Sequence, residues 1–233
     1  MAHILRAGVE LAVGEGPRAA LAELDIGALV QRARRPEAFD IAAALLNALK
    51  VVGKTMETAK VVINGGLLVS VTPEDLGGTD ALAGVAFQRR LEEAAYTLGG
   101  GGYAAPAQTV GDFLARRPST GAGRVVPTYR PAVRWCDLHE CLPDFVCEAL
   151  EEALPLLEKK LRGFAAPDAV LTAVETRSSS PVRITRDEAC QSPALRGLYP
   201  CGEGAGYAGG ILSAAADGMR CAEQIIKELT QHG

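Results

Sequence analysis

The chain has 233 residues, of which 48% are hydrophobic and 22% are charged, and its net charge is −4. A chain of this length and composition can bury a substantial apolar core, which excludes an intrinsically disordered protein. No stretch approaches the roughly 20 consecutive apolar residues that a membrane helix needs, so we expect no membrane span. Surfaces that bind nucleic acid carry a basic excess, so we expect no nucleic-acid partner either.

The six cysteines form no CxxC pair, and no apolar signal segment follows Met1. We therefore predict free thiols and a cytoplasmic location. Cys136, His139 and Cys141 could begin a zinc site, because thiolate and imidazole groups are common zinc ligands. Their spacing matches no common zinc motif and no second ligand pair follows them, so we favour structural roles and expect no bound metal.

The first 63 residues have no assigned role, and we expect them to be mostly helical. A short strand at 11–13 precedes a turn at 14–19 whose GxGxxA pattern loosely matches the turn that binds a dinucleotide pyrophosphate. The apolar run before this turn is short, and no second strand ending in an acidic residue follows, so an ordinary turn is favoured. Apolar residues at helical spacing predict a helix over 36–60.

The middle of the chain alternates apolar runs with glycine. We predict strands at 61–63 and 67–71 on either side of an Asn-Gly-Gly turn, and then an amphipathic helix at 79–98. Four glycines follow at 99–102. Such a run can end a helix or bring the backbone close to a ligand, and the first interpretation is favoured. A short helix is predicted at 107–117.

The C-terminal part of the chain begins with a helix predicted at 142–161, which Pro155 should bend or interrupt. The last helix is expected to start at residue 209 or 210 and to end near residue 229. Between these two helices, strands are predicted at 169–176, 182–185 and 198–200.

Residues 197–226 combine a short strand end, a glycine-rich loop and an alanine-rich helix. The glycines remove side chains where the backbone has to approach a large or flat group. Glu203 places among them a carboxylate that can accept a hydrogen bond from a ribose or ribityl hydroxyl. The helix start near Gly210 has unpaired N–H groups and a partial positive charge, which can stabilise negative charge on a bound group.

This segment resembles the C-terminal flavin-binding motif of flavoproteins with the glutathione-reductase-type FAD fold. More narrowly, it resembles a bacterial family of FAD-dependent, or NAD(FAD)-utilising, dehydrogenases. Four further segments resemble the same family in the same order: 67–78, 82–120, 142–155 and 167–188. The resemblance implies an α/β flavoprotein of the FAD/NAD(P)-binding type with an α+β substrate-type region. It also implies hydride transfer through bound FAD, with NAD(P)H as a candidate electron donor.

The resemblance also assigns site residues. The cofactor-binding residues that it implies are Gly202, Glu203, Gly204, Gly209, Gly210 and Ile211. The polar stretch after the strand at 169–176 either approaches the active-site side or forms a polar turn. Its residues in question are Arg177, Ser178, Ser179 and Arg183. No catalytic base is evident, and the catalytic residues stay unassigned. The tetraglycine run and Gln108 fall in the substrate-type region without a specific role.

The chain departs from such flavoproteins at its N-terminus, where no convincing GxGxxG turn is present. We therefore expect a flavoprotein fragment with three parts: an unassigned region at 1–63, a substrate-type region at 64–165 and a C-terminal FAD-binding segment at 166–233. Two hypotheses follow. The chain is an FAD-dependent oxidoreductase, or it is an incomplete flavoprotein half that acts as an interaction module or is inactive alone. Its expected partners are cofactor and substrate, with either a second copy or a missing N-terminal half.

Overall fold

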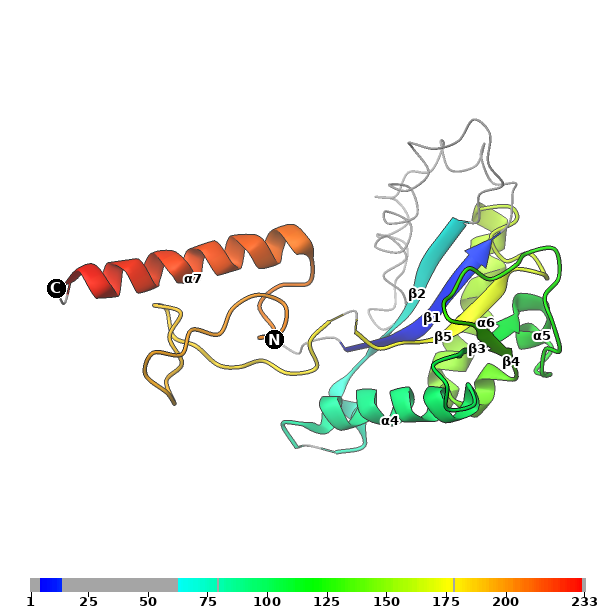
Figure 1. Cartoon of the computed structure of the whole chain (residues 1–233), viewed down its shortest axis with the longest axis horizontal. Helices are drawn as coiled ribbons and strands as arrows, with labels where there is room; N and C mark the ends of the chain where they lie inside the picture. Colours follow the sequence, from blue (N-terminus) through cyan, green and yellow to red (C-terminus); the bar gives the residue numbers. More distant parts are fainter. Residues whose placement is uncertain (1–4, 14–62, 79, 178, 232–233) are drawn as a thin grey trace. The chain divides into compact units, whose positions relative to one another are not determined.

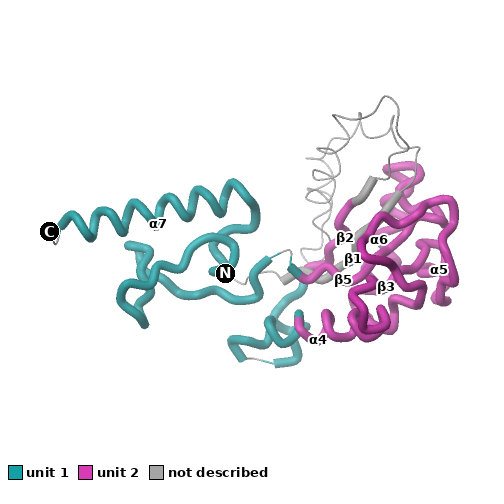
Figure 2. The backbone as a smooth tube through the Cα atoms, viewed as in Figure 1, with its two compact units in different colours: residues 1–5, 71–88, 177–233 teal, residues 6–70, 89–176 magenta. Residues whose placement is uncertain are grey.

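The computed structural model describes residues 5–13, 63–78, 80–177 and 179–231 (Figure 1). The candidate turn at 14–19 and the helix expected over 36–60 lie outside the described residues. The chain forms two compact units, coloured separately in Figure 2. Unit 1 comprises residues 1–5, 71–88 and 177–233, and unit 2 comprises residues 6–70 and 89–176.

A five-stranded sheet forms the framework of unit 2 (Figure 1). The central strand β5 pairs antiparallel with β1 on one side and with β3 on the other, while β3 and β4 are parallel. The sheet is therefore mixed, with antiparallel pairing at its centre. Together with the helices of the chain, it makes the described part a mixed α/β structure. In sheet order the strands are β2 (Ile63–Val71), β1 (Leu5–Val13), β5 (Val170–Glu175), β3 (Ala105–Thr109) and β4 (Val133–Trp135).

Helices pack with this sheet and close the apolar core of unit 2. Helix α6 (Asp144–Lys160) buries a stripe of residues spaced three and four apart, as expected for one face of a helix. The stripe consists of Val146, Cys147, Leu150, Ala153, Leu154 and Leu157. Pro155 lies inside α6, and the helix continues past it to Lys160. The short helices α5 (Val110–Leu114) and η2 (Leu138–Glu140) bury Phe113 and Leu138 completely.

Unit 1 has little regular structure apart from two helices, η1 (Pro73–Leu76) and α7 (Ile211–Gln231). Helix α4 (Ala83–Leu98) begins in unit 1 and continues into unit 2. Within the described part of the chain, no helix is long and apolar enough to cross a bilayer. Residues 179–210 form irregular loops that single backbone and side-chain hydrogen bonds hold together.

Three local predictions were wrong. The Asn-Gly-Gly segment continues as strand in β2 instead of turning, and added β-carbons at Gly65 and Gly66 would meet nothing within 4 Å. The helix predicted at 107–117 is the end of strand β3 followed by α5. The structure divides it at Thr109, whose hydroxyl accepts a hydrogen bond from the Asp112 N–H as an N-cap.

The third error concerns the strands predicted at 182–185 and 198–200, which are irregular. Each segment makes a single backbone hydrogen bond instead of the series of hydrogen bonds that pairs strands in a sheet. The Ile184 N–H donates to the carbonyl of Ala205, and the Ser192 N–H donates to the carbonyl of Leu198. Apolar residues in these segments therefore resemble strands in sequence, but no neighbouring strand pairs with them among the described residues.

Candidate functional site

The glycine-rich loop before α7 is shaped by two buried glycines. Gly202 and Gly206 adopt left-handed backbone angles, with φ of 70° and 80°. A β-carbon on Gly206 would lie 2.5 Å from the carbonyl oxygen of Val182, which is far inside van der Waals contact. Gly206 is therefore required for the loop to pack against the preceding segment, irrespective of any ligand.

A buried ion pair ties this loop to the helix that follows it. Arg186 donates from Nη2 to Oδ1 of Asp217 at 2.6 Å, and from Nη1 to Oδ2 at 2.8 Å. The two side chains are only 6% and 12% exposed. Arg186 also donates to the carbonyl of Pro200 at 2.8 Å, and Asp217 accepts the Gly202 N–H at 2.9 Å. We call Arg186 and Asp217 the clamp, because the pair fixes the start of the loop to α7.

The clamp shifts the pKa values of both partners. Hydrogen bonding from Arg186 is the main cause that lowers the pKa of Asp217 to about 2, with a further contribution from the Gly202 N–H. Burial opposes this shift. The hydrogen bond to Asp217 likewise raises the pKa of Arg186. Both groups are therefore charged at neutral pH, and each compensates the other for its removal from water.

Tyr207 lies against two arginines. The guanidinium carbons of Arg186 and Arg183 are 3.6 and 4.5 Å from the centroid of the Tyr207 ring, which is cation–π geometry. Arg183 also donates from Nε to the carbonyl of Gly206 at 3.2 Å. Ser180 donates its hydroxyl proton to the carbonyl of Gly204 at 3.1 Å. The polar stretch at 180–186 therefore contacts the glycine-rich loop through hydrogen bonds to its backbone carbonyls and through the ring of Tyr207.

Other glycines of the loop leave open space. Gly204 and Gly209 are exposed, and an added β-carbon on either would meet nothing within 4 Å. A β-carbon on Gly210 would meet only the Ser213 hydroxyl oxygen, at 3.7 Å. Ile211, the first residue of α7, is 89% exposed. Bare backbone thus lies beside a helix start whose first N–H groups have no partner within the helix.

This arrangement suits a flat group with hydrogen-bond acceptors along one edge. The helix start supplies backbone donors and a partial positive charge. The half-buried Glu203 supplies a carboxylate, which can accept bonds from hydroxyl groups. A flavin ring with its ribityl chain has both features, so the residues present fit the group.

The sequence-predicted site residues fall on two adjoining segments of unit 1. Gly202 to Ile211 form the loop and the helix start, and Arg183 contacts this loop directly. Arg177 is exposed and Ser179 is half-buried in the stretch before Ser180, while Ser178 lies outside the described residues. No observation tests their assigned roles, which stay predictions. The clamp was missed, since 31 residues separate its partners and no local pattern pairs them.

The cysteine-rich stretch of unit 2 has structural contacts. Both ring nitrogens of His139 are engaged, with Asp137 at 2.6 Å and with Glu151 at 3.0 Å, and its ring stacks on Phe113. Cys141 is buried, and burial raises its pKa to about 12. The described residues contain no group of three or more His, Cys, Asp or Glu side chains arranged to hold a metal ion.

Gln108 also has a structural role in unit 2. Its side chain is completely buried. The amide nitrogen donates to the carbonyl of Arg117 at 2.9 Å and to Asp137 at 3.2 Å, and the amide oxygen accepts the Leu138 N–H at 2.8 Å. These bonds satisfy the buried amide and join β3 to the segments around it.

Two similarities to known proteins bear on this chain. Residues 42–178 match the family model described as "FAD-dependent protein, C-terminal domain-like". An uncharacterised protein of Clostridium beijerinckii is 51% identical over 165 residues, which are 71% of this chain and 31% of the relative. The chain therefore spans about a third of the length of the curated relative that it matches.

Proposed function

Because this chain belongs to the family of FAD-dependent proteins that share this C-terminal domain, we propose that it takes part in flavin-dependent oxidation and reduction. FAD would lie against the glycine-rich loop and the start of α7. The observation that carries the proposal is the bare backbone at Gly209 and Gly210, directly before the start of α7, where the first N–H groups of a helix have no partner within it. NAD(P)H is the proposed electron donor.

The protein's own groups would bind and orient the cofactor. Bound FAD would supply the hydride chemistry itself. The N–H groups at the start of α7 would donate hydrogen bonds to the edge of the ring, where the partial positive charge favours electron-rich atoms. Glu203 would accept a bond from a hydroxyl of the ribityl chain. The clamp would hold the loop in its binding conformation, because it fixes the Gly202 N–H and the Pro200 carbonyl.

The flavin site is tested with Gly210→Leu. In the protein alone, a β-carbon on Gly210 would meet only the Ser213 hydroxyl oxygen, at 3.7 Å, so we expect the variant to fold. In the proposed complex that side chain would occupy the flavin's position. The expected result is protein that no longer takes up FAD, measured from the absorbance of bound flavin after gel filtration. Gly121→Leu is the matched control, since Gly121 is exposed, has open space and lies in unit 2.

The same spectra test the reaction. Wild-type protein loaded with FAD should lose its flavin absorbance when NADH or NADPH is added without oxygen, because the reduced ring absorbs less. Wild-type protein that takes up no added FAD would contradict the binding site. Bound flavin that neither nucleotide reduces would contradict the electron donor but leave the binding site standing.

A second candidate function has support from α7. This helix exposes a series of large apolar residues, and Cys221 is the one residue of the helix that is buried. The exposed large residues are Ile211, Leu212, Met219, Ile226 and Leu229. Leu212, Met219 and Ile226 repeat every seven residues, which is the spacing of a helix face that packs against a partner. This face favours an interaction module that contacts another polypeptide segment.

The partner that we propose for this face is the portion of the longer relative that the chain does not match. Co-expression of the chain with that portion of the Clostridium beijerinckii protein should yield a complex on gel filtration. Met219→Glu places a charge in the centre of the face and should abolish the complex, whereas Glu223→Gln on the same helix should not. Independent elution of the two wild-type polypeptides would rule this function out.

A further inference from the structure

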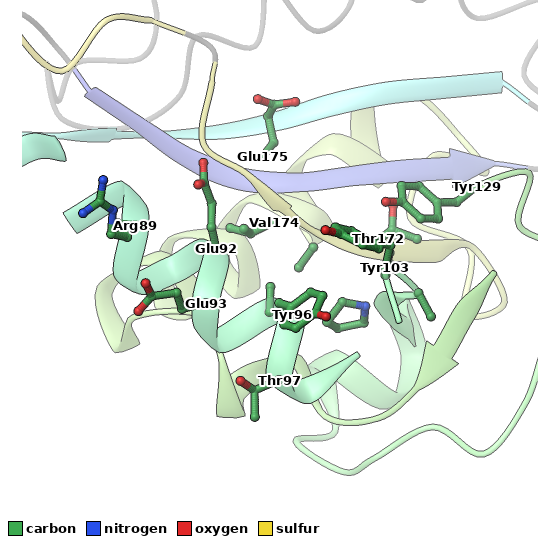
Figure 3. A pocket seen from close by; sticks show the side chains of 15 residues that line it. Arg89, Glu92, Glu93, Tyr96, Thr97, Tyr103, Tyr129, Thr172, Val174 and Glu175 are labelled. Carbon is green, nitrogen blue, oxygen red and sulfur yellow. The ribbon is translucent and has the colours of Figure 1, made fainter. Parts of the chain in front are cut away.

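Unit 2 contains an open cavity of about 820 Å³, and the described residues that line it all belong to this unit (Figure 3). Three segments form its walls: the second half of α4, the stretch from Tyr103 to Pro106, and strand β5 from Thr172 to Glu175. Tyr129 adds a side chain from the irregular connection before β4. Small-molecule sites in proteins commonly have volumes of about 300–1,000 Å³, so the cavity is large enough for a ligand of about two or three rings.

The tetraglycine run connects two walls of this cavity. Gly100 and Gly101 adopt left-handed backbone angles, with φ of 91° and 76°. A β-carbon on Gly99 would lie 2.0 Å from the carbonyl oxygen of Ala104, so the turn between α4 and β3 is tight. The Tyr96 hydroxyl donates to the carbonyl of Gly101. The turn therefore brings the end of α4 and the start of β3 to one cavity.

Tyr103, directly after the glycines, combines a strained backbone with an exposed ring. Its φ is 60°, in the left-handed region that a bulky residue rarely adopts. Tyr103 is 74% exposed, so burial of its ring does not offset the cost of this conformation. Strained backbone positions that the surrounding structure enforces are concentrated at binding and catalytic sites. The position of this ring therefore points to contact with a ligand.

Aromatic rings and small apolar side chains make up much of the lining. The rings of Tyr96 and Tyr103 meet edge to face, with centroids 5.3 Å apart. Figure 3 shows Tyr129 among the side chains around the same cavity. The aliphatic residues of the lining are Ala95, Ala104, Ala105, Pro106, Ala173 and Val174. A flat aromatic ligand would stack on the exposed rings and remove part of their apolar area from water.

The charged groups of the lining give no basis for selecting an ion. Glu92 accepts a hydrogen bond from the Thr176 hydroxyl, with 2.6 Å between the oxygens, and Glu175 also has an interaction partner. Arg89 and Glu93 add opposite charges one turn apart on α4. The aromatic and apolar groups therefore decide the ligand, and they favour an uncharged molecule.

We propose that this cavity binds a neutral planar aromatic molecule, which stacks on the tyrosine rings. The site goes beyond the flavin-dependent function and makes no use of the residues assigned to flavin, so binding can be measured on the chain without FAD. A failure here would leave the flavin proposal untouched, and a failure of flavin binding would leave this site standing.

The test uses 2-naphthol and decahydro-2-naphthol, which share one carbon skeleton and one hydroxyl group and differ in whether the rings are aromatic. Both are uncharged at about pH 7, because a phenolic hydroxyl titrates near about pH 10. NMR titration of the full chain should show about fivefold tighter binding of 2-naphthol, since only flat rings stack on the tyrosines. The amide signals that shift should include those of 103–105 and 172–175.

Three results of this titration would overturn the proposal. They are equal or tighter binding of decahydro-2-naphthol, no measurable binding of 2-naphthol, and shifts confined to segments outside the cavity. The first would show that the rings do not select an aromatic ligand, and the other two would show that the cavity is not a binding site.

Substitutions of the tyrosines locate the binding. Tyr103→Leu removes an exposed ring and should weaken binding of 2-naphthol about fivefold, the size of one aromatic contact. Tyr103→Phe keeps the ring and is the matched control, which should bind like the wild type. Tyr129→Leu, in an irregular segment, should weaken binding by a similar factor. Wild-type affinity in both leucine variants, or equal losses in Tyr103→Phe and Tyr103→Leu, with unchanged thermal unfolding, would reject this site.

Discussion

Unit 2 buries its large apolar side chains around a sheet, whereas the loop and helix of unit 1 are joined mainly by charged and backbone groups. In unit 2, Phe113, Leu150 and Leu171 are fully buried. In unit 1, the Arg186–Asp217 clamp joins the loop to α7, with side chains that are 6% and 12% exposed. Apolar burial is insensitive to pH and tolerates volume-conserving changes, while an ion pair depends on both partners. The two units should therefore respond to different perturbations.

The largest effect is expected from Arg186→Leu. The variant leaves the carboxylate of Asp217 largely buried without its counter-charge, which typically costs about 4 kcal/mol. Hydrogen exchange should accelerate in peptides covering 200–221, with β5 of unit 2 as the internal reference. The double variant Arg186→Leu with Asp217→Leu removes both charges and should recover much of the protection. A double variant as unprotected as the single one would show that charge compensation is not the source of stability.

The corresponding change in unit 2 is Leu154→Ala. Leu154 is fully buried on α6, and removal of such a side chain leaves a cavity that costs about 3 kcal/mol. Urea unfolding followed by the fluorescence of Trp135, which lies in β4, should show the loss. Leu156→Ala is the control, because Leu156 lies on the same helix but is 56% exposed. Equal losses in the two variants would contradict the assigned core.

A smaller effect is expected from Gly206→Ala in unit 1. The new methyl group would collide with the Val182 carbonyl, and alanine disfavours a φ of 80°. The expected cost is about 2 kcal/mol, within the range for strained backbone. Gly204→Ala in the same loop should cost close to nothing, because Gly204 has open space and no left-handed angle. Hydrogen exchange of the loop distinguishes them, and similar protection in both variants would refute the packing.

The smallest expected effect is a change in the NMR signal of Gly202 as Asp217 is protonated at low pH. Because the pKa of Asp217 is lowered to about 2 in the fold, the clamp contributes its full stability above the ordinary aspartate pKa. This contribution is lost as pH falls from the ordinary value through about 2. The amide proton of Gly202, which donates to Asp217, should titrate in NMR spectra with that same low midpoint. A midpoint near the unperturbed value would mean that the clamp is open in solution.

Several elements were predicted from the sequence because each depends on a local pattern. The helix predicted at 142–161 is α6 at Asp144–Lys160, and the strand predicted at 169–176 is β5 at Val170–Glu175. The last helix starts at Ile211, next to the predicted glycines. The patterns predicted α6 and β5 correctly because each element buries the apolar side chains that form its pattern.

The errors arose where long-range contacts decided the structure. Residues 107–109 belong to a strand because β5 pairs with all three and β4 pairs with Ala107, and no signal within 107–117 reveals those partners. The segments at 182–185 and 198–200 have the composition of strands, but among the described residues no strand forms hydrogen bonds with them as in a sheet. Strand formation needs a partner, so composition alone could not separate these two outcomes.

The sequence by itself determined that the chain is a mixed α/β protein, that it resembles FAD-dependent proteins, and that a glycine-rich loop precedes its last helix. These features are local or compositional. Only the tertiary structure decided that Arg186 and Asp217 hold that loop, and that Tyr96, Tyr103 and Tyr129 share a cavity with three glutamates. Such groups meet through packing between distant segments, and the free energy of that packing is not encoded in any short stretch of residues.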